Sequence, residues 1–173
     1  MEKWGKVDYF TYLYAQITFS VEIMMQFLGN IEARIDAKAR VFVPASFRKL
    51  LQASGQNELV LRKDIFQNCL VLYPLVIWEE EVAKLRSRLS RWDKTQQNIF
   101  RQFVLDAERL ELDANGRVLI PKRCLQMASI ESDVTFLGVD NTIEIWAKGE
   151  LEKATISAAD FGQEIERLMG ENV

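Results

Sequence analysis

The sequence of 173 residues contains no histidine, and it has only two cysteines, three prolines and eight glycines. Without histidine there can be no Ser-His-Asp triad, no histidine-ligated zinc and no imidazole proton shuttle. Cys69 and Cys124 lack the spacing of a metal or redox motif, so we expect two reduced, buried thiols. These absences remove most enzyme classes. We expect no metal, no cofactor and no small-molecule substrate, and we do not expect an enzyme.

A long hydrophobic run is also missing. The longest uncharged stretch near the N-terminus, Tyr9–Val21, has 13 residues, whereas a helix that spans a bilayer needs about 20. No small-residue cleavage pattern follows this stretch, so a signal peptide is a poor fit and we expect no membrane partner. Residues 1–24 resemble nothing later in the chain. We interpret them as a disordered extension outside the fold or as the product of a misassigned start codon, with an interfacial anchor as the other interpretation.

The net charge of −3 argues at first against an anionic partner, but the charges are unevenly distributed. Residues 32–50 hold five basic and two acidic side chains, and residues 84–101 hold six basic and one acidic. Residues 140–173 hold three basic and eight acidic side chains. Salt screens charges beyond about 8–10 Å, so the basic front of the chain can bind nucleic acid despite its acidic rear. The plainer interpretation of residues 84–101 is a solvated helix face.

The sequence contains an internal repeat. Residues 36–44 are DAKARVFVP and residues 113–121 are DANGRVLIP, so five of nine positions match at an offset of 77. The similarity extends upstream, where QFLGNIEARI corresponds to FVLDAERLEL, and downstream into two strand-like runs in each copy. This pattern indicates duplication of a unit of about 50 residues, which is too small to bury its own apolar face. We expect the two copies to form an intramolecular pseudo-dimer.

Each copy has the same predicted order of elements. Alternating apolar and polar residues predict a strand over 31–36, and Pro44 then begins a helix whose buried stripe is Phe47, Leu50 and Leu51. Two helices are expected between the copies, from Pro74 to about Val104. A single amphipathic helix is expected from Gly149 to Met169.

The repeated Asp-x-x-x-Arg motif has two interpretations. In the first, Asp36 and Asp113 cap tight turns while Arg40 and Arg117 brace them, with Gly116 supplying backbone freedom. In the second, the two arginines present planar guanidinium groups to phosphates or guanine edges. A surface ion pair contributes only about 0–1 kcal/mol, too little to explain the motif as a stabilising device. Both interpretations stay open on the residues alone.

Several longer strings resemble the MraZ family of bacterial transcriptional regulators. They are MQFLGNIEARIDAKARVFVPASFRKLL, CLVLYPLVIWEE, the second DANGRVLIP and TIEIWAKGELE, and the likeness covers about residues 25–155. The family is encoded at the head of the division and cell-wall gene cluster and has two AbrB/SpoVT-type domains. Members usually have glycine before the first motif arginine, where this chain has Ala39. If that turn needs a positive φ, alanine costs about 1 kcal/mol there.

The resemblance implies an α+β fold, a duplicated swapped-hairpin AbrB/MraZ-like β-barrel pseudo-dimer with a linker helix and a C-terminal helix. The expected units are an N-terminal extension, a first AbrB/SpoVT-like repeat, a helical linker, a second repeat and a C-terminal helix with tail: 1–24, 25–75, 76–103, 104–148 and 149–173. The resemblance also implies a transcriptional regulator, expected to be a repressor, that is cytoplasmic and nucleoid-associated. It would form a homo-oligomeric ring that binds direct promoter repeats in double-stranded DNA. The expected DNA-binding residues are Arg34, Lys38, Arg40, Arg48 and Arg117, and the turn-shaping residues are Asp36, Asp113 and Gly116.

Three other functions remain open on the sequence. An AbrB-type antitoxin would use its C-terminal tail to neutralise a toxin. A ring-forming protein without DNA binding would use its basic linker for contacts between subunits. An enzyme would pair Asp36 with Asp113, but neither aspartate has the small hydroxyl-and-glycine surroundings of an aspartic protease.

Overall fold

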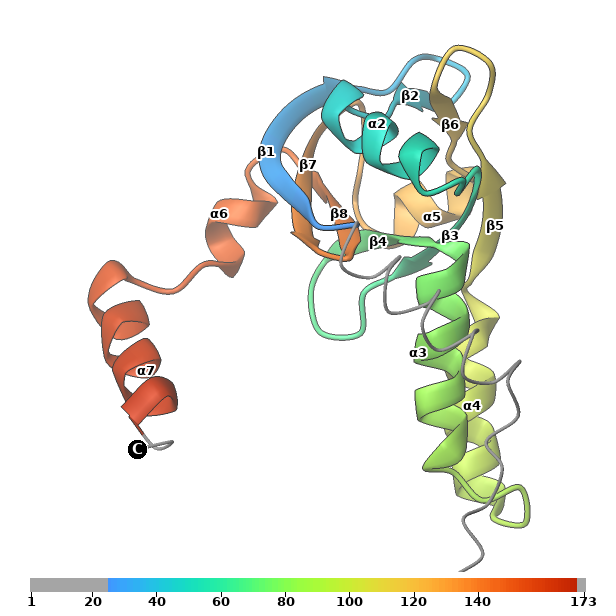
Figure 1. The fold of residues 1–173 in the computed structure, drawn as a ribbon, viewed down its shortest axis with the longest axis vertical. Coiled ribbons are helices and arrows are strands. Elements are labelled where there is room, and N and C mark those ends of the chain that lie inside the picture. Colours follow the sequence, from blue (N-terminus) through green and yellow to red (C-terminus); the bar gives the residue numbers. More distant parts are fainter. Residues whose placement is uncertain (1–24, 171–173) are drawn as a thin grey trace, which may run out of the picture.

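The computed structural model describes residues 25–170, and its first repeat alternates strands with one helix (Figure 1). In chain order the elements are β1 (Phe27–Arg34), β2 (Arg40–Phe42), α2 (Ala45–Ala53), β3 (Glu58–Lys63) and β4 (Cys69–Pro74). Burial alternates along β1 because apolar and polar residues alternate in its sequence. Pro44 occupies the N-cap of α2, and Phe47 and Leu51 are buried, as predicted, whereas Leu50 of the expected stripe is only half-buried.

The second repeat has the same element order. It consists of β5 (Glu108–Glu111), β6 (Arg117–Leu119), α5 (Lys122–Met127), β7 (Asp133–Asp140) and β8 (Thr142–Ala147). The offset of 77 between the repeated motifs therefore also relates β2 to β6. The boundaries proposed above for the whole units stay a prediction.

The two repeats are interleaved in one antiparallel sheet with the strand order β1-β7-β8-β4-β3-β5. Strand β1 of the first repeat pairs with β7 of the second, and β5 of the second repeat pairs with β3 of the first. Gly138 permits the close approach of β1 to β7, since a Cβ there would lie 2.5 Å from the carbonyl carbon of Phe27.

The expectation of a closed β-barrel is wrong for the part of the chain that the structure describes. Strands β1 and β5 are the two edges of the six-stranded sheet, and no described strand connects them. The strands that could continue the sheet, β2 and β6, instead pair with each other as a separate two-stranded ribbon. The fold is therefore α+β, with an open and mainly antiparallel sheet.

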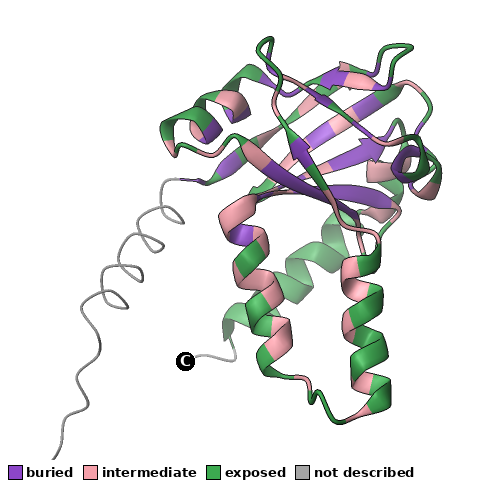
Figure 2. Ribbon diagram, turned by 90° about the vertical axis from the view of Figure 1, so that its right-hand side faces the viewer, coloured by how far each residue is buried: buried purple, intermediate pink, exposed green. Residues whose placement is uncertain are grey.

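The core lies between the sheet, the ribbon and the helices α2 and α5. Phe27 and Phe47 pack edge-to-face in it, with ring centroids 5.5 Å apart. Val41 and Val118, the inward residues of the ribbon, are also fully buried there. Cys69 and Cys124 are buried and unpaired, which confirms the expected free thiols. Figure 2 shows that the buried residues concentrate in the strands, while the projecting helices are mostly exposed or intermediate.

Two helices, α3 (Leu75–Ser87) and α4 (Lys94–Leu105), form a hairpin that projects from the sheet (Figure 1). Trp78 and Phe103 stack across it with ring centroids 5.4 Å apart, and the Arg62 guanidinium lies 4.4 Å from the Phe103 ring. The two helices expected between the copies are therefore present, and Phe103 lies in the second of them, which ends at Leu105 before β5 begins at Glu108.

The C-terminal segment forms two helices rather than the single helix expected. They are α6 (Glu150–Ala154) and α7 (Ala158–Gly170). The chain is extended at Thr155, and Ser157 then begins α7 because its Oγ accepts a hydrogen bond from the Asp160 backbone N–H at 3.2 Å. Every residue of α7 is exposed, and the helix stands apart from the sheet in Figure 1.

Two other expectations concern the membrane and the N-terminus. Within the described residues, no helix combines the length and the apolar character that crossing a membrane requires. The interpretation of residues 1–24 as an extension or a start-site product falls outside the described residues.

Candidate nucleic-acid interface

Each Asp-x-x-x-Arg motif forms a tight turn that is clasped by its own side chains. In the first turn, Asp36 Oδ1 accepts hydrogen bonds from the backbone N–H groups of Lys38 and Arg40, both at 2.9 Å. Asp36 Oδ2 accepts from Arg40 Nε at 2.9 Å and lies 2.7 Å from Arg40 Nη2. One carboxylate therefore fixes both the turn and the direction of the guanidinium that follows it.

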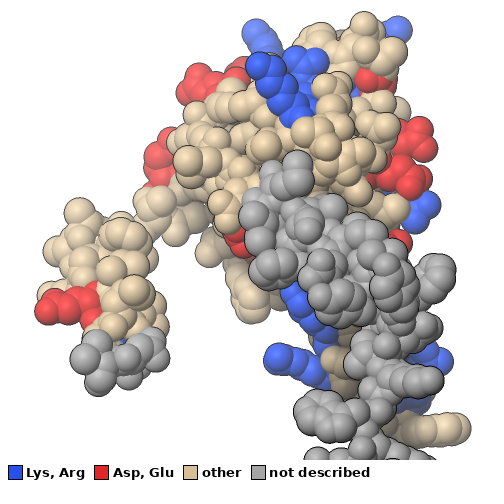
Figure 3. All heavy atoms as spheres, viewed as in Figure 1, with Lys and Arg blue, Asp and Glu red and all other residues tan. Residues whose placement is uncertain are grey.

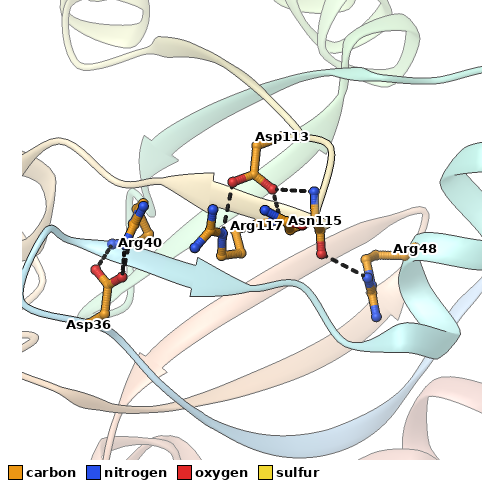
Figure 4. Close-up of polar contacts among 6 residues, drawn as sticks. All are labelled: Asp36, Arg40, Arg48, Asp113, Asn115 and Arg117. Carbon is orange, nitrogen blue, oxygen red and sulfur yellow. Dashed lines mark hydrogen bonds and ion pairs between the residues drawn. The ribbon is translucent and has the colours of Figure 1, made fainter.

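The second turn repeats this geometry with little change. Asp113 Oδ1 accepts from the backbone N–H groups of Asn115 and Arg117 at 2.9 Å, and Oδ2 accepts from Arg117 Nε at 2.8 Å. Arg117 thus donates its Nε–H to the clasp in the same way as Arg40 does in the first turn. Figure 4 shows the two clasps side by side on neighbouring strands.

The residue before each arginine adopts a left-handed backbone conformation, with φ of 62° at Ala39 and 80° at Gly116. The first turn therefore does need a positive φ, and alanine meets that need at a cost of about 1 kcal/mol. Backbone bonds across the ribbon hold both residues in place. Ala39 O accepts from Ile120 N at 2.9 Å, and Gly116 O accepts from Val43 N at 3.1 Å. The turn that contains Ala39 therefore has the same form as the turn that contains Gly116.

Strands β2 and β6 carry the two arginines onto one exposed surface. Arg40 pairs in register with Leu119, Val41 with Val118, and Phe42 with Arg117. Because side chains alternate along a strand, the valines point inward and the other four residues point outward. We call residues 36–42 and 113–119 the Asp–Arg ribbon.

Arg48 of α2 links the first repeat to the turn of the second. Its Nη1 donates a hydrogen bond to the Asn115 carbonyl oxygen at 3.2 Å (Figure 4). The side chain also covers Gly116, where a Cβ would lie 2.2 Å from Nη1. The residue at the corresponding place in the second repeat is Leu125, which lines a hollow beside Ala39. The two turns are therefore supported differently, one by an arginine and the other by an apolar side chain.

Four of the five expected DNA-binding residues fall into two groups. Lys38 and Arg40 belong to the first turn, while Arg117 and Arg48 meet at the second. Arg34 lies at the end of β1, where its Nε is 3.7 Å from Asp133 Oδ1 and its side chain is 79% exposed. It lines the hollow, of about 620 Å³, together with Asp36 and Ala39. The fold thus brings four of the five to the Asp–Arg ribbon or its support and leaves Arg34 beside it.

The motif aspartates stay ionised. Hydrogen bonds from the Arg40 side chain and backbone lower the pKa of Asp36 to about 2. The Arg117 backbone N–H, and then its side chain, lower the pKa of Asp113. Each carboxylate is held in its own turn, whereas an acid–base pair shares a proton between touching carboxyl groups. Among the described residues no cluster of three or more Cys, Asp or Glu side chains could hold a metal ion.

Figure 3 shows lysines and arginines over α2 at the upper end of the molecule and a second group along the hairpin of α3 and α4. Sequence reasoning missed two residues of the Asp–Arg ribbon, Phe42 and Leu119, which are 55% and 58% exposed beside the arginines. Each lies two residues after a motif arginine on the same strand. Because side chains alternate along a strand, this spacing places them on the same outward face as the arginines.

The fold and the site together define a duplicated α+β protein in which each repeat contributes one strand and one clasped arginine to a shared ribbon. The same duplication is found when the sequence is compared with known protein families. The chain belongs to the MraZ family: the family model described as "MraZ protein, putative antitoxin-like" matches residues 26–102 and again residues 103–172.

Several relatives are named "Transcriptional regulator MraZ". The one from Phocaeicola vulgatus is 57% identical over 148 residues, which cover 86% of this chain and 96% of the relative. The one from Bacteroides fragilis is 55% identical over 148 residues, covering 86% of this chain and 94% of the relative. A more distant relative from Shewanella oneidensis is 37% identical over 138 residues, which cover 80% of this chain and 88% of the relative.

Proposed function

We propose that this chain is a transcriptional regulator that binds double-stranded DNA sequence-specifically through the Asp–Arg ribbon. The observation that carries the proposal is the pair of clasped arginines on an exposed two-stranded ribbon. The major groove of DNA is wide enough to admit a two-stranded ribbon, and arginine bonds bidentately to guanine O6 and N7. Because the aspartates hold each guanidinium in place beforehand, less side-chain entropy is lost on binding.

The remaining basic residues have a different role in this proposal. Lys38, Arg34 and Arg48 lie around the ribbon and would contact the phosphates on either side of the groove. Asp36 and Asp113 would shape the turns without touching DNA, because a carboxylate near phosphate is repelled. Substitution of a phosphate-binding residue weakens binding to every sequence, whereas substitution of a base-contacting arginine also relaxes specificity.

Fluorescence anisotropy on the promoter upstream of the protein's own gene tests this division of roles. We expect Arg40→Ala and Arg117→Ala each to lose about 5- to 150-fold in affinity for the promoter and little on a random duplex. Lys38→Ala should weaken both duplexes alike and lower the salt slope by about one. Arg167→Ala on α7 removes the same type of charge far from the ribbon and serves as the control. Retention of promoter affinity by both motif variants at moderate salt would contradict the proposal.

We propose further that the chain acts as a homo-oligomeric ring on direct promoter repeats of the division and cell-wall gene cluster, as a cytoplasmic, nucleoid-associated repressor. The family membership supports this assignment. One ribbon contacts only a short stretch of DNA, so linking several ribbons in one particle raises the affinity without any new contact. Sedimentation of the protein with duplexes of one, two and three repeats tests it. Equal affinity for all three duplexes would refute the multivalent ring.

One observation favours a second candidate, an antitoxin-like interaction module. The helix α7 exposes an apolar face that includes Phe161, Ile165 and Met169. If a toxin binds this face, it should copurify with the full chain. It should no longer copurify with a chain that lacks residues 156–173. DNA binding that survives this truncation, with no partner lost, would leave the regulator as the better assignment.

A further inference from the structure

Two large apolar side chains lie beside the arginines of the Asp–Arg ribbon. Phe42 and Leu119 are related by the offset of 77 between the repeats, as are Arg40 and Arg117. They point outward from the ribbon and are 55% and 58% exposed. The Arg117 guanidinium carbon lies 5.7 Å from the centre of the Phe42 ring. The outward face of the ribbon is thus a two-by-two array in which each arginine lies opposite an apolar residue.

These two side chains do not belong to the buried core of the described residues. The core contact of the ribbon is made by Val41 and Val118, which are 1% and 0% exposed on the opposite face. A solvated ribbon normally carries polar or charged residues on its outer side. Large apolar residues on the outer side of both strands, at equivalent positions, therefore point to contact with a partner.

The dimensions of the array match successive base pairs. Directly opposite residues on neighbouring strands lie about 5 Å apart, and residues two apart on one strand lie about 6.8 Å apart. Base pairs in a duplex rise by about 3.4 Å. The four side chains therefore cover about two or three neighbouring base pairs. The only apolar group on a base edge in the major groove is the C5 methyl of thymine.

We propose that Phe42 and Leu119 determine sequence specificity by packing against thymine C5 methyl groups, beside the base pairs that Arg40 and Arg117 contact. This inference rests on the proposed function and specifies it further. The ligand is a duplex in which thymines neighbour guanines within each short element, and the apolar residues select the thymines. The two side chains differ in size, so the two halves of the array are not equivalent and each subunit has a preferred orientation on the duplex.

Replacement of thymine by uracil tests the contact, because it removes only the methyl group. Anisotropy is measured on promoter duplexes in which single thymines are replaced one at a time. For the wild-type chain we expect an affinity loss of about fourfold at the contacted thymines, the value for one buried methyl group. Phe42→Ala and Leu119→Ala should each weaken binding to the thymine duplex and abolish the uracil penalty at their own position. Phe42→Leu should retain the penalty.

Leu28→Ala provides the matched control, since Leu28 is 87% exposed on β1 and lies outside the ribbon. It should behave as the wild type on every duplex. Uracil penalties that are unchanged in Phe42→Ala and Leu119→Ala would overturn this inference while leaving promoter binding intact. A wild-type chain that binds no duplex would overturn the proposed function as well. A changed sedimentation coefficient of these variants without DNA, with unchanged uracil penalties, would assign the face to contact between copies of the chain.

Discussion

Replacement of Gly116 by alanine tests whether Arg48 supports the second turn. Gly116 has a φ of 80°, and a Cβ added there would lie 2.2 Å from Arg48 Nη1 and 2.5 Å from Arg48 Cδ. The left-handed conformation costs a residue with a Cβ about 1–2 kcal/mol. Displacement of Arg48 removes its hydrogen bond to Asn115, which contributes about 1 kcal/mol. The lower flexibility of alanine in the unfolded chain returns about 0.4–1 kcal/mol.

The net destabilisation is about 2 kcal/mol, which corresponds to a fall in Tm of about 4–8 °C. Gly55→Ala separates the two causes, because Gly55 has a φ of 70° and no atom within 4 Å of an added Cβ. It should show the backbone cost alone. In the double variant Arg48→Ala/Gly116→Ala, the free energy of unfolding should decrease by no more than the backbone cost at residue 116 plus the contribution of the lost hydrogen bond. A Gly116→Ala chain that melts at the same temperature as Gly55→Ala would refute the supporting role of Arg48.

Three further outcomes are expected. Ala39→Gly should change the free energy of unfolding by less than about 1 kcal/mol, as measured by thermal melting. The substitution relieves about 1–2 kcal/mol of backbone strain, but it also removes a buried methyl group and makes the unfolded chain more flexible. The pKa of Asp36 is lowered to about 2, so its stabilising contribution is complete above about pH 4 and is lost as the pH falls towards 2. Asp36→Asn should therefore show a weaker acid dependence in melts between pH 5 and 2, and an identical dependence would contradict the clasp. Burial raises the pKa of Cys69 to about 12 and also raises that of Cys124, so neither thiol should react with iodoacetamide at pH 8 until the chain unfolds, as mass spectrometry would record.

The sequence predicts the elements of this fold well where the signals are local. The alternation along β1, the proline before α2 and the hydrophobic spacing of α3 each depend on a few neighbouring residues, and all three elements are present. The duplication also depends only on comparing the chain with itself. It correctly relates the two turns, including the positive φ shared by Ala39 and Gly116.

The errors have two different causes. The open sheet follows from the pairing of β2 with β6, which no local pattern specifies. The break between α6 and α7 was a missed local signal, since Ser157 and Asp160 form a capping pair with the spacing S-x-x-D.

The site shows the same division. The motif spacing was enough to find Asp36, Arg40 and their counterparts, because the clasp is formed within five residues. It could not place Arg48 on the turn of the other repeat, a contact between residues 67 positions apart. Phe42 and Leu119 were passed over because an apolar residue on a strand is normally taken as core, and only the burial of Val41 and Val118 fixes which face is outward.

The interleaving of the two repeats constrains how the chain can fold during synthesis. Strand β1 pairs with β7, with Phe27 opposite Asp140 and Arg34 opposite Asp133. The strand β1 therefore cannot pair until residues 133–140 have been synthesised. During translation the hairpin of β3 and β4 can form early, but β1 stays without a partner until the second repeat has left the ribosome. Contacts of such long sequence separation slow folding and leave strand edges open to association with other chains. A nascent chain interrupted between the repeats would therefore expose β1 as an unpaired edge and depend on chaperones or proteolysis.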